Sequence, residues 1–162
     1  MISGRTEKRL SEAACKMPTE RSGTFVANVS SRPDCDALVA ATVERFGRID
    51  TVVNAAGMNL VGTIEESSDQ DWDECIASDL SGVFYMSRAA VPHLKETKGS
   101  IVNIGSVSSL GGGWSHAAYN AAKGGVANLT RSAACDLGKF GVRANSGTGT
   151  YCYGNGGCHH GR

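Results

Sequence analysis

A serine, a tyrosine and a lysine stand at a spacing that could do acid–base chemistry at a carbonyl or alcohol oxygen. Ser106 follows the apolar run 100–104, Tyr119 comes thirteen residues later, and Lys123 four residues after that. Four residues are about one helical turn, so Tyr119 and Lys123 should share a helix face, where the ammonium lowers the tyrosine pKa from its usual value of about 10. Such a tyrosine can exchange a proton with a substrate oxygen that Ser106 holds by a hydrogen bond. This combination indicates carbonyl–alcohol redox chemistry, with the hydride supplied by a cofactor.

The elements that must position these residues alternate between strands and helices. We expect helices at 6–16, 32–46, 71–94 and 117–137, and strands at 24–29, 49–53, 100–104 and 142–145. Thr6 should cap the first helix, while Pro33 and Gly47 delimit the second. The pattern predicts an α/β fold with a doubly wound parallel sheet. Ligands bind such sheets at the carboxyl ends of the strands, where Asn54 and Ser106 both fall.

The bulk properties exclude several classes of function. The chain has 162 residues, long enough for one domain with a core, and its 16 basic and 16 acidic residues give a net charge of zero. No basic stripe predicts nucleic-acid binding, no apolar run approaches the ~18 residues that span a membrane, and residues 1–5 lack the apolar core of a signal peptide. By these properties we expect a cytoplasmic protein of the soluble class, with no membrane contact. Four cysteines, Cys15, Cys35, Cys75 and Cys135, lie singly in helical patterns, so we expect buried or half-buried thiols.

At this point the residues resemble the short-chain dehydrogenase/reductase family, whose active-site signature is Ser-x12-Tyr-x3-Lys. Further stretches resemble the family's landmarks in the right order: the lead-in 46–50, the Asn-Asn-Ala-Gly turn at 53–57, and the sixth strand at 141–145. The resemblance covers residues 1–145, which we take as a partial Rossmann-type domain. It implies oxidoreduction between a carbonyl and a secondary alcohol by hydride transfer.

The family's opening strand and its glycine-rich phosphate turn, TGxxxGxG, have no counterpart in the sequence. Residues 1–5 resemble the end of the second strand, so about thirty residues, the usual size of that unit, would precede them. The fold should therefore be incomplete, with a gap at the centre of the sheet where that strand would pair on both sides. We expect poor solubility from such a chain.

The resemblance also assigns roles to individual residues. Tyr119 would be the general acid/base, Lys123 would tune it and hold the ribose hydroxyls, and Ser106 would orient the substrate carbonyl. Asp79 occupies the position of the family's catalytic asparagine. Either Asp79 takes the part that the asparagine has in the family's proton relay, or its carboxylate makes only a local hydrogen bond within the helix.

The cofactor is predicted to be NADP or NAD. By resemblance, its contacts would be Asn54, Ala56 and Gly57 beside the adenosine and ribose, Asn28 at the adenine amino group, and Tyr119 and Lys123. Arg5 stands near the position where NAD-preferring members keep an acidic residue, and an arginine there favours a 2′-phosphate. This favours NADP over NAD.

The resemblance implies a small carbonyl or alcohol compound as the substrate. The loop 108–116, with Trp114 inside it, should line a partly apolar pocket. The stretches 92–99 and 111–114 look like bacterial acetoin/butanediol reductases, although 3-oxoacyl carrier-protein reductases are also compatible.

The ending 146–162 is a separate, glycine-rich tail. The tail contains four residues of types that can bind metals, Cys152, Cys158, His159 and His160. Their spacing matches no usual zinc module, so we expect no metal. The codons that can encode residues 148–155 can also be read in a shifted frame, starting at the second base of each codon. In that frame they permit, in order, Pro, Gly, Pro, Thr or Ile, Val or Ala, Thr, Glu and Met. This is the sequence that the family would place here. We therefore expect a frameshifted continuation.

Two other interpretations remain open. The chain could be a catalytically inactive fragment, pseudogene-like or frameshifted, that cannot bind a dinucleotide because it lacks the phosphate turn. It could also be an inactive dimerisation partner, because the family's oligomerisation helices, here 71–94 and 117–137, are complete. If folded, it should form a homodimer or homotetramer.

Overall fold

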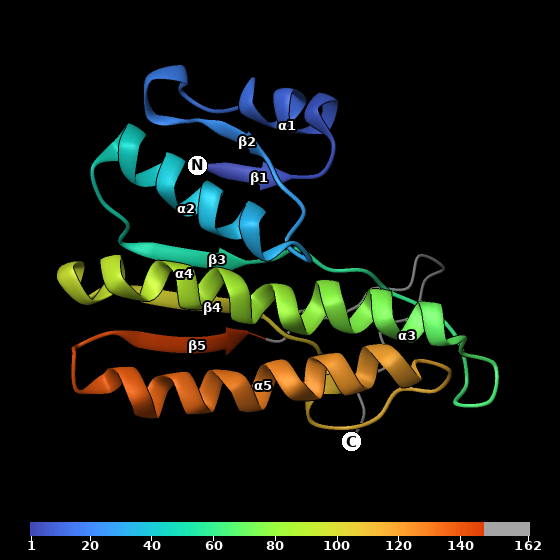
Figure 1. Ribbon diagram of the computed structural model, residues 1–162. Helices are drawn as coiled ribbons and strands as arrows, with labels where there is room; N and C mark the ends of the chain where they lie inside the picture. Colours follow the sequence, from blue (N-terminus) through green and yellow to red (C-terminus); the bar gives the residue numbers. More distant parts are fainter. Residues whose placement is uncertain (148–162) are drawn as a thin grey trace.

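The computed structural model of the chain describes residues 1–147 as five parallel strands and five α-helices in alternation (Figure 1). The strands are β1 Ile2–Gly4, β2 Thr24–Val26, β3 Thr51–Asn54, β4 Ser100–Ile104 and β5 Arg143–Gly147; the helices are α1 Glu7–Ala14, α2 Arg32–Phe46, α3 Asp69–Ile76, α4 Gly82–Thr97 and α5 Ala117–Gly138. The predicted α/β class is confirmed. The tail lies, apart from Ser146 and Gly147, outside the described residues, so its ligand and frameshift interpretations stay predictions, as does the boundary at 145.

The strands form two separate sheets rather than one. β1 pairs with β2, and β3–β4–β5 form a second sheet in that order, with Asn54 opposite Asn103 in register. All five strands point the same way (Figure 1). The interruption lies between β1 and β3, where the sequence predicts the missing central strand, so the fold is Rossmann-like but incomplete.

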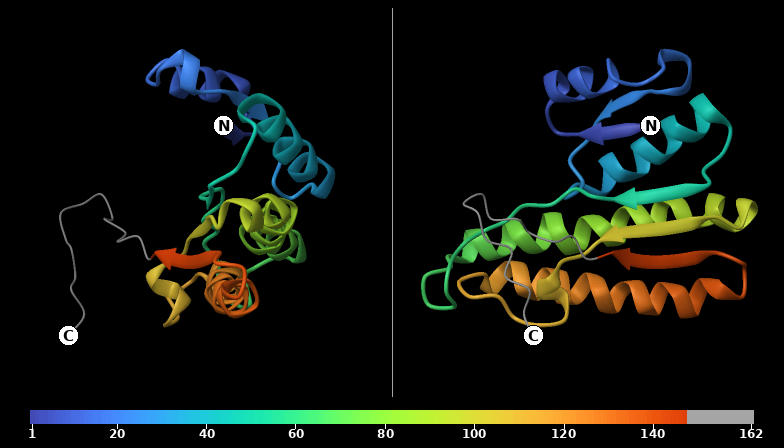
Figure 2. Two further views of the ribbon diagram at one scale, coloured as in Figure 1. Left: turned by 90° about the vertical axis from the view of Figure 1, so that its left-hand side faces the viewer. Right: turned by 180° about the vertical axis from the view of Figure 1, so that it is seen from behind.

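The helices cover the two faces of the sheets unequally. In Figure 2, α2, α4 and α5 lie on one face, and α1 lies on the other beside β1 and β2. The main core forms on the three-helix face, and Leu94, Ala90 and Ile101 at its centre are fully buried. On the opposite face Val53 is 59% exposed and Ile104 is 40% exposed, although parallel strands are normally covered on both sides.

Local signals explain where α2 begins and ends. The Ser31 hydroxyl accepts a hydrogen bond from the Asp34 amide, Pro33 lies in the first turn, and Gly47 closes the helix in the left-handed region at φ 77°. Thr6 is the N-cap residue of α1, as predicted, but its side chain makes no capping hydrogen bond. Strand β2 stops three residues earlier than predicted because Asn28 Oδ1 accepts the Ser30 amide in a turn.

The predicted helix over 71–94 is present, but it is longer than predicted and irregular. α3 begins at Asp69, and a five-residue π-helix, Ala77–Ser81, separates it from α4, which runs on to Thr97. The end of α4 is bound to the segment just before β3, because the Thr97 hydroxyl donates to the Ile49 carbonyl at 2.8 Å. The π-helix carries Asp79, which is fully buried.

The four cysteines of the described residues are free thiols, as expected. Cys35 and Cys75 are buried, but Cys15 and Cys135 are exposed, contrary to the expected partial burial. Within residues 1–147 no helix is both long enough and apolar enough to cross a bilayer.

Candidate active site

The carboxyl ends of β3 and β4 lie side by side, so the loops that follow Asn54 and Ile104 emerge from the same edge of the sheet. Ser106 lies in the second of these loops and is fully buried. Its hydroxyl accepts a hydrogen bond from the Ser108 amide at 3.2 Å, and its own amide donates to Ser109 Oγ at 3.0 Å. These reciprocal bonds form a capping box on the short 3-10 turn 107–109. They fix the Ser106 oxygen in place while its O–H can still donate to a ligand.

Tyr119 and Lys123 lie on one face of the first turns of α5, as their spacing predicts. Both are buried, with 4% of Tyr119 and 6% of Lys123 exposed, and Lys123 Nζ lies 5.6 Å from the centre of the tyrosine ring. The Tyr119 ring packs in a small apolar cluster with Cys75, Ala118 and Ala122. Its position is thus set by packing as well as by helix geometry.

Two oxygen atoms from other elements hold the Lys123 ammonium. Nζ donates to the Ile104 carbonyl at the end of β4 at 3.1 Å and lies 3.4 Å from Asp79 Oδ2. Within residues 1–147 Asp79 Oδ2 accepts no hydrogen bond, so this contact is an ion pair, and the ammonium keeps N–H groups that can bind a ligand hydroxyl. This arrangement ties α5 both to the strand that leads into Ser106 and to the π-helix.

Asp79 makes contacts well beyond its own helix, so the interpretation of a purely local hydrogen bond is wrong. Its Oδ1 accepts from the Met58 amide at 2.7 Å and from the neighbouring Ser78 hydroxyl at 2.5 Å, while Oδ2 pairs with Lys123. Gly57 approaches so closely that a Cβ there would lie 2.7 Å from Asp79 Oδ2. The carboxylate therefore joins the loop after β3 to the lysine.

Burial raises the pKa of the Cys75 thiol to about 11, and the Asp79 carboxylate adds to the shift. Cys75 lies in the same apolar cluster as Tyr119. A thiol with that pKa stays protonated near neutral pH, so Cys75 is a packing residue and not a nucleophile.

Asn54 is held by a buried polar network. Its Nδ2 donates to Asn103 Oδ1 at 2.8 Å and to Ser87 Oγ at 3.1 Å, and Asn103 Nδ2 in turn donates to Thr130 Oγ1 at 2.8 Å. The network fastens β3 to β4, α4 and α5. The sequence analysis missed Asn103 and Thr130, although a polar residue inside the buried strand 100–104 is a signal that could have found Asn103.

Arg5 and Asn28 belong to the other sheet, just past the ends of β1 and β2. Both are exposed. Asn28 Oδ1 accepts the Ser30 amide, and its backbone amide donates to Asp34 Oδ2 at 2.8 Å. The structure thus brings Ser106, Tyr119, Lys123 and Asp79 together around α5, whereas Arg5 and Asn28 lie across the interruption of the sheet.

The loop 108–116 lines a shallow hollow, as predicted: its residues Trp114 and His116 lie there with Ile64, and the Trp114 indole is 95% exposed. That the hollow holds the substrate stays a prediction. The loop is fastened to the segment after β3, because the Gly62 amide donates to the Ser115 carbonyl at 2.7 Å. The His116 ring lies edge-on to the Tyr119 ring, with 6.1 Å between the two ring centres. The sequence analysis did not identify this contact. Within residues 1–147 no group of three histidine, cysteine, aspartate or glutamate side chains converges as a metal site.

Comparison with known proteins agrees with this arrangement. A sequence model of the family described as enoyl-(acyl carrier protein) reductases matches residues 1–147. Meso-2,3-butanediol dehydrogenase of Serratia marcescens is 41% identical over 140 residues, which are 86% of this chain and 56% of that protein. The chain belongs to the short-chain dehydrogenase/reductase family.

Other members of the family are similarly close. Trans-4-hydroxycyclohexanecarboxylate dehydrogenase of Sinomonas cyclohexanicum is 46% identical over 110 residues, which are 68% of this chain and 42% of that protein. The crystal structure of a short-chain dehydrogenase from Mycobacterium smegmatis superposes with a TM-score of 0.82 at 35% identity, covering 90% of this chain and 62% of the other. The chain spans about half the length of these two curated relatives. Both relatives are dehydrogenases by name.

Proposed function

We propose that this protein interconverts a carbonyl and a secondary alcohol by hydride transfer, with Tyr119 as the general acid/base. The observation that carries the proposal is the placement of Lys123. Its ammonium lies 5.6 Å from the centre of the Tyr119 ring and is held there by the Ile104 carbonyl and Asp79. A fixed cation beside a phenol favours the phenolate, which can take a proton from an alcohol or, when protonated, give one to a carbonyl oxygen.

The other residues of the site have supporting roles in this proposal. Ser106 is buried with its oxygen fixed, so it would orient the substrate oxygen by donating its hydroxyl proton. Asp79 would hold Lys123 in place. A nicotinamide dinucleotide supplies or accepts the hydride when bound.

The residues present fit one half of such a dinucleotide. An N–H of Lys123 can donate to a ribose hydroxyl, and the loop of Asn54, Ala56 and Gly57 leaves the sheet on the same edge. In residues 1–147 no glycine-rich turn leads from a strand into a helix beside this edge, so the pyrophosphate has no cradle of backbone amides there. We therefore expect weak binding of the dinucleotide.

We further propose NADP rather than NAD, and a small secondary alcohol as the substrate. Arg5 is exposed just past β1, where a guanidinium can pair with a 2′-phosphate. The two relatives are named as dehydrogenases of a butanediol and of a hydroxycyclohexanecarboxylate. Each of these compounds has a secondary hydroxyl. The hollow lined by Trp114, Ile64 and His116 offers apolar contact for such a molecule.

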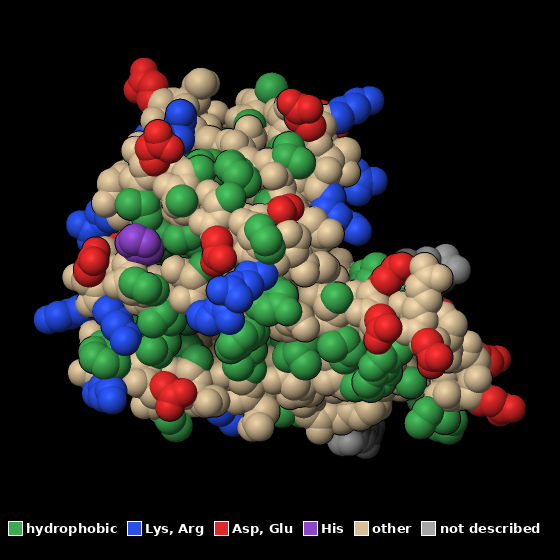
Figure 3. All heavy atoms as spheres, viewed as in Figure 1, with side chains coloured by type: hydrophobic (Ala, Val, Ile, Leu, Met, Phe, Trp, Pro, Cys, Tyr) green, Lys and Arg blue, Asp and Glu red, His purple; other side chains and the backbone are tan. Residues whose placement is uncertain are grey.

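A second candidate function is an inactive oligomerisation partner. It is favoured by the interrupted sheet and by exposed aromatic side chains on the α3 and α4 helices, where Trp72 is 44% exposed and Phe84 is 43% exposed. Figure 3 shows hydrophobic side chains gathered along the face of α4 and α5. A homodimer or homotetramer through these helices would bury them.

The test is turnover with a small ketone. Purified protein is incubated with diacetyl or acetoin and NADPH, with NADH in parallel, and nicotinamide absorbance is followed. We expect slow oxidation of NADPH by the wild type and none by Tyr119→Phe, which keeps the ring that packs on Cys75 and Ala122. Equal rates in the two proteins would overturn the assignment of Tyr119, and no turnover by a folded wild type would favour the inactive partner.

A further inference from the structure

The loop 108–116 is fastened to the helix that follows it by one side chain. Asn120 Nδ2 donates a hydrogen bond to the Gly113 carbonyl at 2.8 Å. Asn120 also lines the shallow hollow, of about 390 Å³, to which Trp114 contributes. This bond ties the middle of the loop to the first turn of α5, the helix that carries Tyr119.

The fastened part of the loop, 111–113, is costly to hold in one conformation. Glycine loses more backbone entropy on folding than any other residue, and here three glycines follow one another. They have no side chains that could pack against the rest of the protein. The loop therefore depends on contacts from other elements to keep its position.

A second fastening holds the far end of the loop. The Gly62 amide donates to the Ser115 carbonyl at 2.7 Å, and the Ala117 amide donates to the Gly62 carbonyl at 3.2 Å. Ser115 lies in the left-handed region at φ 55°, which residues other than glycine rarely adopt. Such a backbone conformation persists only where the surrounding contacts impose it. The loop is thus held from two sides, by Asn120 of α5 and by the segment after β3.

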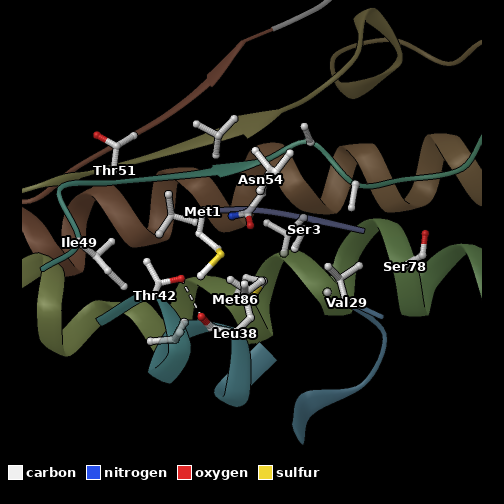
Figure 4. A pocket seen from close by; sticks show the side chains of 18 residues that line it. Met1, Ser3, Val29, Leu38, Thr42, Ile49, Thr51, Asn54, Ser78 and Met86 are labelled. Atoms are coloured by element: carbon white, nitrogen blue, oxygen red, sulfur yellow. Dashed lines mark hydrogen bonds between the residues drawn. The ribbon is translucent and has the colours of Figure 1, made fainter. Parts of the chain in front are cut away.

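The bond from Asn120 leaves its other amide atom without a partner. Of residues 1–147, only Asp79 Oδ2 and Asn120 Oδ1 are buried side-chain atoms with no hydrogen bond, and both belong to the candidate site. By contrast, in the cavity between β1 and β3, Figure 4 shows the Thr42 hydroxyl bonded to the Leu38 carbonyl, at 2.7 Å. A buried acceptor without a donor destabilises the fold. Asn120 is therefore poorly explained by stability, and its effect on the loop remains as its role.

The residues that exchange the proton do not depend on this loop for their positions. Ser106 is held by the 3-10 turn, Tyr119 by its apolar cluster, and Lys123 by oxygen atoms of two other elements. Loss of the Asn120 bond leaves all these contacts in place. It loosens only the wall of the hollow, so it should weaken substrate binding and spare the chemical step.

We propose that Asn120 is a positioning residue for substrate binding, whose amide holds the loop 111–116 in the arrangement that forms the hollow. The inference rests on the proposed oxidoreductase function and adds to it a residue outside the set that exchanges the proton. Asn120 acts through the position of the loop, so it sets the KM for the substrate and leaves kcat to Tyr119 and Lys123.

The test compares Asn120→Ala with Asn128→Ala, which removes an exposed asparagine about two turns further along the same helix. Neither change places a new charge beside Tyr119. With acetoin and NADPH, we expect Asn120→Ala to raise the KM for acetoin by about fivefold or more and to keep kcat within about twofold of the wild type. Asn128→Ala should leave both constants within about twofold.

The melting temperature separates this role from a purely structural one. In Asn120→Ala it should stay equal or rise, because alanine favours the helix and the unpartnered Oδ1 is removed together with the bond. A KM equal to that of the wild type would overturn the proposal. So would a lower melting temperature with a parallel loss of kcat, because Asn120 would then only support the fold.

Amide hydrogen exchange tests the fastening without turnover. The Gly62 and Ala117 amides join the loop to the segment after β3. They should exchange at least about fivefold faster in Asn120→Ala, and within about twofold of the wild type in Asn128→Ala. If the wild type is active and these amides exchange equally in all three proteins, the fastening is wrong and the proposed function stands. If no protein turns over acetoin, the proposed function fails and the role of Asn120 fails with it.

Discussion

Asp79 Oδ2 lies 3.4 Å from Lys123 Nζ, and both side chains are buried, the carboxylate completely. The resemblance predicts an asparagine at this position in the family, whereas this chain has a direct ion pair there. The pair holds the lysine beside Tyr119 and also anchors the loop after β3 through Met58. Asp79 therefore supports the site and the fold together.

Removing the carboxylate should be costly. In Asp79→Leu the Lys123 ammonium stays buried without its partner and the Met58 amide loses its acceptor, so we expect a loss of about 3–5 kcal/mol of unfolding free energy. Asp79→Asn keeps an oxygen for Met58 and should lose clearly less. Urea denaturation of the three proteins measures the difference. An Asp79→Leu variant as stable as the wild type would contradict the buried pair.

Gly57 should be intolerant of a side chain. A Cβ there would lie 2.7 Å from Asp79 Oδ2 and 3.2 Å from Cγ, so Gly57→Ala must displace the carboxylate or the loop. We expect a destabilisation of about 1–3 kcal/mol in the same denaturation assay. Gly124→Ala is the matched control, because a Cβ at that position of α5 meets nothing within 4 Å. It should be neutral or stabilising by up to about 1 kcal/mol, and equal losses in the two variants would be inconsistent with this geometry.

Two buried thiols make stability depend on alkaline pH. Burial raises the pKa of Cys35 and that of Cys75 to about 11 in the folded protein, above the ordinary thiol value of 9.0. The unfolded chain releases these protons first as the pH rises, so the free energy of unfolding should fall between about pH 9 and pH 11. Replacing both thiols by alanine should flatten that part of the profile. A profile unchanged by the double replacement would contradict the raised pKa values.

Arg5 should set the preference between the two nicotinamide dinucleotides. It is exposed at the end of β1, so Arg5→Glu should leave the melting temperature unchanged while removing the partner of a 2′-phosphate. We expect the ratio of NADPH to NADH affinity to drop by about tenfold or more. Arg9→Glu, an exposed charge reversal on α1, is the control. An unchanged ratio in Arg5→Glu would argue against the preference for NADP.

Sequence spacing alone was enough to place Tyr119 and Lys123 together, because helix periodicity fixes neighbours four residues apart. The alternation of elements likewise predicted the α/β class, and the absent glycine-rich segment predicted the interruption of the sheet. Contacts that depend on how distant loops meet were not predictable. The bond from the Met58 amide to Asp79 spans 21 residues and requires the π-helix, whose irregular turn leaves no periodic signal in the sequence. The exposure of Trp114 depends in the same way on where the loop 111–116 comes to rest.

The central claim is that this chain forms a site for a nicotinamide dinucleotide, and a titration of the purified protein with NADPH tests it most directly. Nicotinamide fluorescence is followed as NADPH is added, with NADH in parallel and with circular dichroism to show that the protein is folded. We predict saturable enhancement with NADPH, at an affinity weaker than a complete phosphate cradle would give. A folded protein that leaves NADPH fluorescence unchanged at all concentrations would contradict the claim.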